Sequence, residues 1–322
     1  MMSIVKDFMR WIYWHPCRFV MQRLPLQTGY NMADFLAPLF AAVSIKDSRV
    51  IREGIEGFYE DKISARKIDT ILLKTFKNTI YTAVEVLWYP KLSRDLCKKI
   101  STIRGIENLD EGLKQNRGVV LLHGHFGNAH MIMPLIGYRG YKLYQLASRI
   151  PPEPIQGFIG GILYLFRKNA FEIKLSYKEK LPVNFIYTDR SIREVLRALQ
   201  RNEVIAIGFD GREGTKPEIF DFLGHKAIFY TGTMKLIMKA KPVVLPTFHL
   251  RDGGKHVLVI EKPVDLTDMG DEKASLTMNM RKLIDILESY VHRYPDHYVK
   301  VFSLGDRFFV SSSKRMESEV NL

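Results

Sequence analysis

Four short and uninterrupted apolar runs constrain the fold of this chain more than any other feature of its sequence. They occupy residues 119–122, 204–207, 243–245 and 257–260. Short apolar runs bounded by turn residues are typical of strands covered on both faces, as in the parallel sheets of α/β proteins. A helical pattern at residues 192–199 stands between two of the runs, as a crossover connection requires. We therefore predict an α/β fold with a mixed, largely parallel sheet flanked by helices.

Length and charge narrow the classes of protein to consider. The chain has 322 residues, of which 46% are hydrophobic, so it can bury a substantial core. Its formal charge of +13 indicates an anionic partner, which is a nucleic acid, an acidic carrier protein or the negative face of a membrane. Cys17 and Cys97 form no metal-binding or disulfide pattern, which is consistent with a reducing cytosolic compartment.

The sequence predicts an amphipathic helix within residues 1–43. On a helical wheel Ile4, Phe8 and Trp11 fall on one side, whereas Asp7 falls on the other. Such a helix suits the headgroup boundary of an anionic membrane. The alternative is a terminal helix docked on its own domain, which has the same periodicity. No apolar stretch reaches the roughly 18 residues of a spanning helix, so we predict interfacial helices in this segment.

The rest of the chain divides into three predicted parts. Residues 44–104 are charged and helical in pattern, and we expect them to pack on the domain that follows them. Residues 105–310 alternate between short strands and helices and form the predicted α/β domain. Residues 311–322 are expected to be a disordered tail.

Three histidines crowd the turn that follows the first apolar run. They are His123, His125 and His130. Active-site groups in parallel sheets collect just beyond the carboxyl ends of the strands, and the imidazole pKa suits a general base at neutral pH. We predict that His125 is this base and that His123 points to the opposite face of the strand in a structural role. Zinc ligation is the alternative, but the spacing fits no standard signature and no cysteine is near, so we assign no metal.

The four residues from His125 to Asn128 read His-Phe-Gly-Asn. They resemble the core motif of the lipid A biosynthesis late acyltransferase family, of lauroyl and myristoyl acyltransferase type, in the glycerolipid acyltransferase superfamily. Further segments resemble blocks of that family: 105–109, 118–122, 148–149, 210–212, 222–224, 241–246 and 294–298. The resemblance covers most of residues 104–309.

The resemblance implies a membrane-associated O-acyltransferase of lipid A and lipopolysaccharide biosynthesis. The donor would be an acyl thioester on acyl carrier protein or coenzyme A. The acceptor would be a hydroxyl of an anionic lipid, above all a lipid A precursor or a related glycolipid or lysophospholipid. His125 would deprotonate this hydroxyl without a cofactor and without an acyl-enzyme. The implied location is the cytoplasmic face of a bacterial inner membrane, in peripheral or monotopic form.

One position departs from the family pattern. The family has a glutamate or aspartate where this chain has His130. A neutral imidazole can accept the Nδ1 proton of His125, but it supplies no negative charge to the imidazolium that forms during the reaction. Three accounts remain open. His130 is a weaker orienting partner, a carboxylate from elsewhere such as Asp210 supplies the charge, or the protein is a catalytically impaired lipid-binding relative.

Several further residues are candidates for substrate binding. Arg149 and Arg212 can pair with a phosphate on an anionic lipid or carrier, and the alternative for each is a surface ion pair. Asn128, Phe222 and Gly224 follow from their matches to family blocks. Aromatic and aliphatic side chains around Phe222 either line an acyl groove or pack in the core; they are Phe220, Leu223 and Phe229.

Two other classes of function explain the sequence less well. A nucleic-acid-binding protein would account for the positive charge, but the basic residues are dispersed and no recognition motif is evident. It would also leave the histidines after the first strand unexplained. A serine hydrolase is disfavoured because the chain has no Gly-x-Ser-x-Gly motif.

Overall fold

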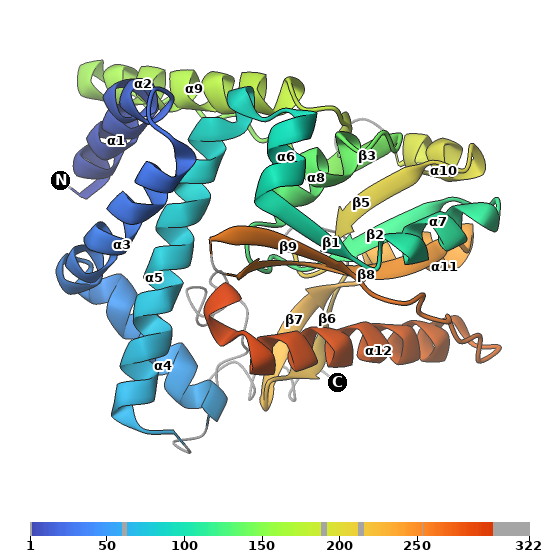
Figure 1. Ribbon diagram of the computed structural model, residues 1–322. Helices are drawn as coiled ribbons and strands as arrows, with labels where there is room; N and C mark the ends of the chain where they lie inside the picture. Colours follow the sequence, from blue (N-terminus) through green and yellow to red (C-terminus); the bar gives the residue numbers. More distant parts are fainter. Residues whose placement is uncertain (1, 60–62, 188–191, 212–215, 253, 299–322) are drawn as a thin grey trace.

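The computed structural model describes residues 2–59, 63–187, 192–211, 216–252 and 254–298, and it has a mixed α/β fold (Figure 1). Its central sheet has seven strands in the order β1-β9-β8-β2-β5-β3-β4. These strands are β1 (Ser101–Arg104), β2 (Val119–His123), β3 (Leu143–Ala147), β4 (Asn184–Tyr187), β5 (Val204–Gly208), β8 (Val243–Asp252) and β9 (Lys255–Ile260). A separate antiparallel hairpin consists of β6 (Pro217–Phe222) and β7 (His225–Tyr230).

Helices precede the sheet in the chain and then alternate with its strands. The first group is α1 (Met2–Ile12), α2 (Arg18–Met21), α3 (Leu26–Val43), α4 (Ile45–Tyr59), α5 (Ala65–Trp88) and α6 (Arg94–Ile100). The second group is α7 (Ile106–Lys114), α8 (Ile132–Gly137), α9 (Phe158–Glu179), α10 (Arg193–Gln200), α11 (Gly232–Ala240) and α12 (Glu272–Arg293). Short helical turns lie at η1 (Tyr13–Cys17), η2 (Tyr89–Lys91), η3 (Ala129–Met131) and η4 (Pro295–His297).

The four apolar runs form strands of the central sheet, as predicted. Strand β2 lies between β5 and β8, and Leu121 stands opposite Ala206 on one side and Leu245 on the other. All five residues of β2 are buried, which explains the uninterrupted apolar run at residues 119–122. The sheet is parallel except for the pairing of β8 with β9. Helix α10 precedes β5 and confirms the predicted crossover helix. Strand β1 begins at Ser101, a few residues before residue 105, where we expected the α/β domain to begin.

The parallel arrangement places three loops at one edge of the sheet. Strands β2, β5 and β3 are neighbours and run in the same direction, so their carboxyl ends meet there. The residues that follow these strands include His125, Asp210 and Arg149. In open parallel sheets this edge is where ligands bind.

Helix α5 lies between the N-terminal helices and the sheet (Figure 1). It begins after Ser64, whose side chain caps the helix by accepting from the backbone N–H of Lys67. One side of α5 packs against α3 and α4, and η4 contacts it near the sheet. Helix α5 thus carries its buried side chains, including Glu85, to the loops around His125.

The apolar side of α1 faces outward. Val5 and Phe8 are more than half exposed, whereas Asp7 is 1% exposed and forms ion pairs with Arg10 of α1 and Arg167 of α9. A helix docked by its apolar side would show the opposite pattern. Helix α3 also exposes large apolar side chains; they are Met32, Phe35, Leu39, Phe40 and Val43. None of the helices in the described ranges has the length and apolar character needed to cross a membrane.

Candidate active site

The imidazole of His125, in the loop after β2, contacts the carboxylate of Asp210, which follows β5. The distance from His125 Nδ1 to Asp210 Oδ1 is 2.7 Å. The backbone N–H of His125 also donates to both carboxylate oxygens, at 3.0 Å to Oδ1 and 2.8 Å to Oδ2. Pairing of His123 with Gly208 in the two adjacent strands brings the loops together. The edge of the sheet therefore joins two residues that are 85 positions apart in sequence.

Asp210 is a buried and ionised carboxylate. Its side chain is 0% exposed, and Tyr298 donates its hydroxyl to Oδ2 at 2.9 Å. Burial raises the pKa of Asp210, but the charge of His125 and the hydrogen bonds from His125 and Tyr298 together bring this pKa below its ordinary value. Burial and the charge of Asp210 raise the pKa of Tyr298 well above its ordinary value, so its phenol remains a donor. These contacts fix both the charge and the orientation of Asp210.

The contact with Asp210 determines which nitrogen of His125 can act as a base. An ionised carboxylate only accepts hydrogen bonds, so Nδ1 carries the proton and Nε2 carries the lone pair. The side chain of His125 is 33% exposed, whereas its carboxylate partner lies fully inside the protein. Nε2 of His125 can therefore take a proton from a nearby hydroxyl, and the Asp210 carboxylate can stabilise the imidazolium that results.

The next two residues of the motif support the loop. Phe126 is buried, stacks on the ring of His297 and makes an edge contact with Phe248. Gly127 has a φ of +56°, and a Cβ there would lie 2.2 Å from the carbonyl oxygen of His249. Its backbone N–H donates to the carbonyl of His297 at 2.7 Å. Glycine is therefore required at this position for both its backbone conformation and its close approach to β8.

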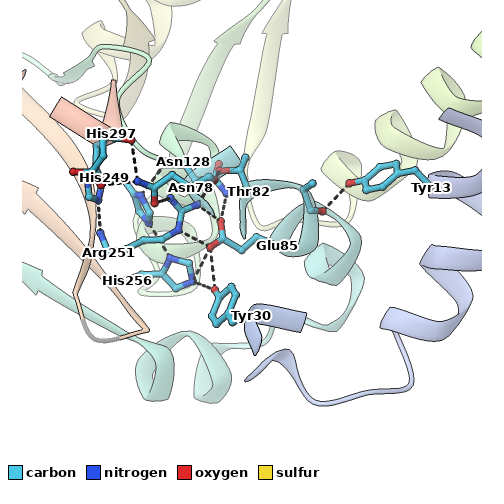
Figure 2. Close-up of polar contacts among 12 residues, drawn as sticks. Tyr13, Tyr30, Asn78, Thr82, Glu85, Asn128, His249, Arg251, His256 and His297 are labelled. Atoms are coloured by element: carbon cyan, nitrogen blue, oxygen red, sulfur yellow. Dashed lines mark hydrogen bonds and ion pairs between the residues drawn. The ribbon is translucent and has the colours of Figure 1, made fainter. Parts of the chain in front are cut away.

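Asn128 points away from solvent into a buried polar network (Figure 2). Its side-chain amide donates to Glu85 Oε2 at 2.6 Å, and its backbone N–H donates to His249 Nδ1 at 3.0 Å. Glu85 in turn pairs with Arg251. We predicted Asn128 as a substrate-binding residue from the family resemblance, and the structure gives its amide contacts inside the protein.

The structure provides the carboxylate for His125 from elsewhere in the chain, which was the second of our three accounts. If His130 were the orienting partner, it would accept the Nδ1 proton of His125. In the structure this proton is directed to Asp210 instead. His130 itself lies in η3 and is half-buried. His123 is buried at the end of β2, with its Nδ1 3.2 Å from the carbonyl oxygen of Gly124. Within the described residues, no group of three or more potential ligands is arranged to hold a metal ion.

The two predicted phosphate-binding arginines differ in what the structure says of them. Arg149 is exposed just after β3, at the same edge of the sheet as His125, and its guanidinium lies 5.6 Å from the ring centre of Tyr187. Arg212 lies outside the described residues. Arg149 thus has an exposed charge at the edge where the candidate base lies.

The predicted acyl-groove side chains are packed in the core. Phe222 is fully buried, and its ring contacts Phe229 and Tyr298. The remaining members are buried too; they are Phe220, Leu223 and Phe229. These side chains therefore belong to the core, which was the alternative to an acyl groove. Phe222 packs against Tyr298, the residue whose hydroxyl donates to Asp210. Gly224, at φ +77°, forms the exposed tip of the β6–β7 hairpin, where a positive φ favours glycine.

Sequence reasoning missed two residues of this site. Tyr298 belongs to the segment 294–298, which resembled a family block, but nothing in the sequence linked its hydroxyl to Asp210. Glu85 lies in a charged helical segment where a solvent-exposed position is the ordinary expectation. Its apolar neighbours Val84 and Val86 were the available signal, because a charge between them in a buried helix needs a partner.

Comparison with known proteins gives one family. The model of the family described as bacterial lipid A biosynthesis acyltransferase matches residues 2–303, which is nearly the whole chain. The match includes the loop after β2, Asp210 and the helices that precede the sheet. No curated protein matches the chain.

Proposed function

Because the chain belongs to the family of bacterial lipid A biosynthesis acyltransferases, it is an acyltransferase that acts on lipid, and we propose the following reaction. A fatty acyl chain passes from a thioester of acyl carrier protein or coenzyme A to a hydroxyl of a lipid A precursor or a related glycolipid or lysophospholipid. His125 acts as the general base. The observation that carries this proposal is the contact between the partly exposed His125 ring and the buried Asp210 carboxylate.

The proposed reaction needs no covalent enzyme intermediate. Nε2 of His125 takes the proton of the acceptor hydroxyl while the oxygen attacks the thioester carbonyl. Asp210, paired with Nδ1, stabilises the imidazolium. When the tetrahedral intermediate collapses, the carbon–sulfur bond breaks, and the imidazolium returns its proton to the departing thiolate. The products are an acylated lipid and a free thiol, and His125 is again neutral.

Charge supports an anionic donor and acceptor. The chain carries a formal charge of +13, which would attract both an acidic carrier protein and phosphorylated lipids. Arg149 would bind a phosphate at the edge of the sheet that carries His125. We keep Arg212 as a proposed second phosphate contact, because it follows Asp210 closely in the sequence.

The exposed apolar side chains support attachment to a membrane surface. In the proposal, Val5 and Phe8 of α1 and Phe35 of α3 enter the headgroup region, while the basic residues nearby meet lipid phosphates. Burial of Asp7 against Arg167 supports this orientation, because it fixes the side of α1 that faces α9. The proposed location is the cytoplasmic face of a bacterial inner membrane, in peripheral or monotopic form.

A catalytically impaired lipid-binding relative remains the alternative function, and His130 is the observation that favours it. The contact of Asp210 with His125 argues against an impaired relative, because Asp210 supplies the negative charge that His130 lacks. The two functions differ in whether acyl transfer occurs at all, so one assay separates them.

Purified full-length protein with a radiolabelled acyl thioester and a lipid A precursor tests the proposal. We expect a lipid product heavier by one acyl group, identified by mass spectrometry. Free fatty acid in place of the thioester is the control and should give no product, because it lacks a leaving group. Lipid binding without any transfer, from carrier-protein and coenzyme A thioesters alike, would reject the proposal in favour of the impaired relative. Lipids from cells with and without the gene then identify the acceptor.

A further inference from the structure

A buried polar cluster connects helices α3 and α5 to the loop of His125, and the proposed reaction does not use it (Figure 2). We name it the Glu85 cluster, and its members are Tyr30, Glu85, Asn128, His249, Arg251 and His256. They come from five parts of the chain: α3, α5, the loop after β2, strand β8 and strand β9.

An ion pair forms the centre of the cluster. Arg251 donates from Nε to Glu85 Oε1 at 2.9 Å and from Nη2 to Glu85 Oε2 at 2.8 Å, and both side chains are less than a tenth exposed. Arg251 also donates to Asn78 and Thr82 of α5. Burial raises the pKa of Glu85, but Arg251, His256 and the hydrogen bonds it accepts bring this pKa below its ordinary value. Glu85 is therefore an ionised acceptor.

The remaining hydrogen bonds have a fixed direction. The backbone N–H of Asn128 can only donate, so His249 Nδ1 accepts and His249 Nε2 carries a proton. That proton goes to His256 Nδ1, at 2.8 Å, and His256 Nε2 then donates to the Tyr30 oxygen at 3.2 Å. The Tyr30 hydroxyl donates to Glu85 Oε1 at 3.0 Å. Burial lowers the pKa of His249 well below its ordinary value, which keeps this ring neutral.

The cluster forms a closed ring that begins and ends at Asn128. From the Asn128 backbone it runs through His249, His256 and Tyr30 to Glu85, and the Asn128 side chain donates to the other oxygen of Glu85 at 2.6 Å. The backbone N–H and the side-chain NH₂ of Asn128 are therefore both held by groups outside its own loop. A residue held at its backbone and its side chain has little freedom to shift.

Asn128 lies three positions after His125, and contacts of the intervening backbone restrict how far the two residues can move relative to each other. Gly127 donates to the carbonyl of His297 and lies against His249, while the His125 backbone is bonded to Asp210. We propose that the Glu85 cluster is a positioning unit, in which Glu85 and Tyr30 act through Asn128 to hold the His125 ring on Asp210. This inference rests on the proposed function for its effect on catalysis and assigns α3 and α5 a role in the active site.

The test compares two hydroxyl deletions on neighbouring rings. Tyr30→Phe removes the hydroxyl inside the cluster. Tyr81→Phe is the matched control, because its ring contacts that of Tyr30 at 5.0 Å while its hydroxyl donates to the exposed Asp34. We expect Tyr30→Phe to lower kcat for acyl transfer about tenfold with an unchanged KM for the thioester, since small misplacements of a reacting group lower the rate steeply. Tyr81→Phe should leave both constants unchanged.

A second readout is independent of catalysis. In protein with ¹⁵N-labelled histidine, the Nδ1 proton of His125 is assigned by its loss in His125→Ala, and we expect it to exchange slowly while it is bonded to Asp210. We expect its exchange with solvent to become at least tenfold faster in Tyr30→Phe and to stay unchanged in Tyr81→Phe. If wild-type protein transfers no acyl group, the proposed function fails, and this exchange rate alone decides the positioning role.

Two further variants of the cluster complete the test. Asn128→Ala removes the side-chain link to Glu85 without leaving a buried charge unpaired, and it should reproduce both effects of Tyr30→Phe. Glu85→Gln should do so as well if it folds. The inference is overturned if Tyr30→Phe and Asn128→Ala lower the melting temperature but leave kcat and the exchange rate at the values of Tyr81→Phe. It is overturned equally if neither variant changes any of these quantities.

Discussion

Replacement of Asp210 by asparagine removes the negative charge behind His125 while keeping the shape of the side chain. In the wild-type protein Asp210 accepts from the His125 ring, the His125 backbone and Tyr298, and its side chain is fully buried. The variant leaves an amide group facing these donors. We expect a loss of about 1–3 kcal/mol in the free energy of unfolding, the cost of poorly satisfied buried polar groups.

The effect on catalysis is larger and follows from the charge. Two unit charges about 4 Å apart interact by about 4 kcal/mol at an effective dielectric constant of about 20. Loss of this stabilisation from the imidazolium in the transition state corresponds to a rate decrease of about 10³-fold. We therefore expect Asp210→Asn to lower kcat about 10³-fold at saturating thioester, with little change in KM.

A single-turnover transfer assay measures the rate, and circular dichroism with a melting curve establishes that the variant is folded. Tyr298→Phe is the matched control, since it removes one donor to Asp210 but keeps the carboxylate. Loss of one hydrogen bond costs about 1 kcal/mol, so the rate should fall by no more than about tenfold. A folded Asp210→Asn protein with a rate within tenfold of wild type would refute the assignment of Asp210 as the charged partner of His125.

Three further predictions concern His130, the buried histidines and the apolar surface. His130→Glu restores the family pattern, yet it should give no rate increase because Asp210 already takes the Nδ1 proton of His125; a clear gain in the transfer assay would show that His130 is a handicapped orienting residue. Burial lowers the pKa values of His249 and His256. The unfolded chain therefore binds more protons below the ordinary histidine pKa of about 6.5, and the free energy of unfolding should fall as pH drops below that value, by up to about 1.4 kcal/mol per pH unit for each histidine. Urea unfolding at pH 7.5 and pH 5.5 checks this, and equal stability at the two pH values would contradict it. Phe35→Asp should weaken sedimentation with anionic phospholipid vesicles without lowering the melting temperature, because this side chain is 80% exposed; unchanged vesicle binding would exclude α3 from the membrane contact.

The sequence was most informative where burial is uniform. Strands β2, β5 and the first part of β8 are covered on both faces, so their sequences are uninterrupted apolar runs. Strands β3 and β4 lie toward one edge of the sheet and are only partly buried, and polar residues such as the exposed Asn184 of β4 interrupt their apolar pattern. No periodicity analysis of a four- or five-residue segment separates such strands from loops.

The candidate site was predictable in part. The position of His125 after a buried strand pointed to a base, and Asp210 was one of several possible partners. The choice among them depends on β2 and β5 being neighbours in register, which is a property of the whole sheet. The Glu85 cluster could not be predicted from the sequence for the same reason, because its members meet only after α5 packs against the sheet. For α1 the helical wheel separated Asp7 from the apolar side chains, but only the burial of Asp7 and its pairing with Arg167 show that this residue faces inward.

The most direct test of this account is the single-turnover rate of acyl transfer by His125→Ala, measured at saturating thioester and lipid acceptor. If His125 is a general base oriented by a buried carboxylate, the rate of His125→Ala should be at least about 10³-fold below that of wild type. Lipid binding and the melting temperature should be retained. A folded His125→Ala protein that transfers the acyl chain within tenfold of the wild-type rate would contradict the role of His125 on which the proposed reaction depends.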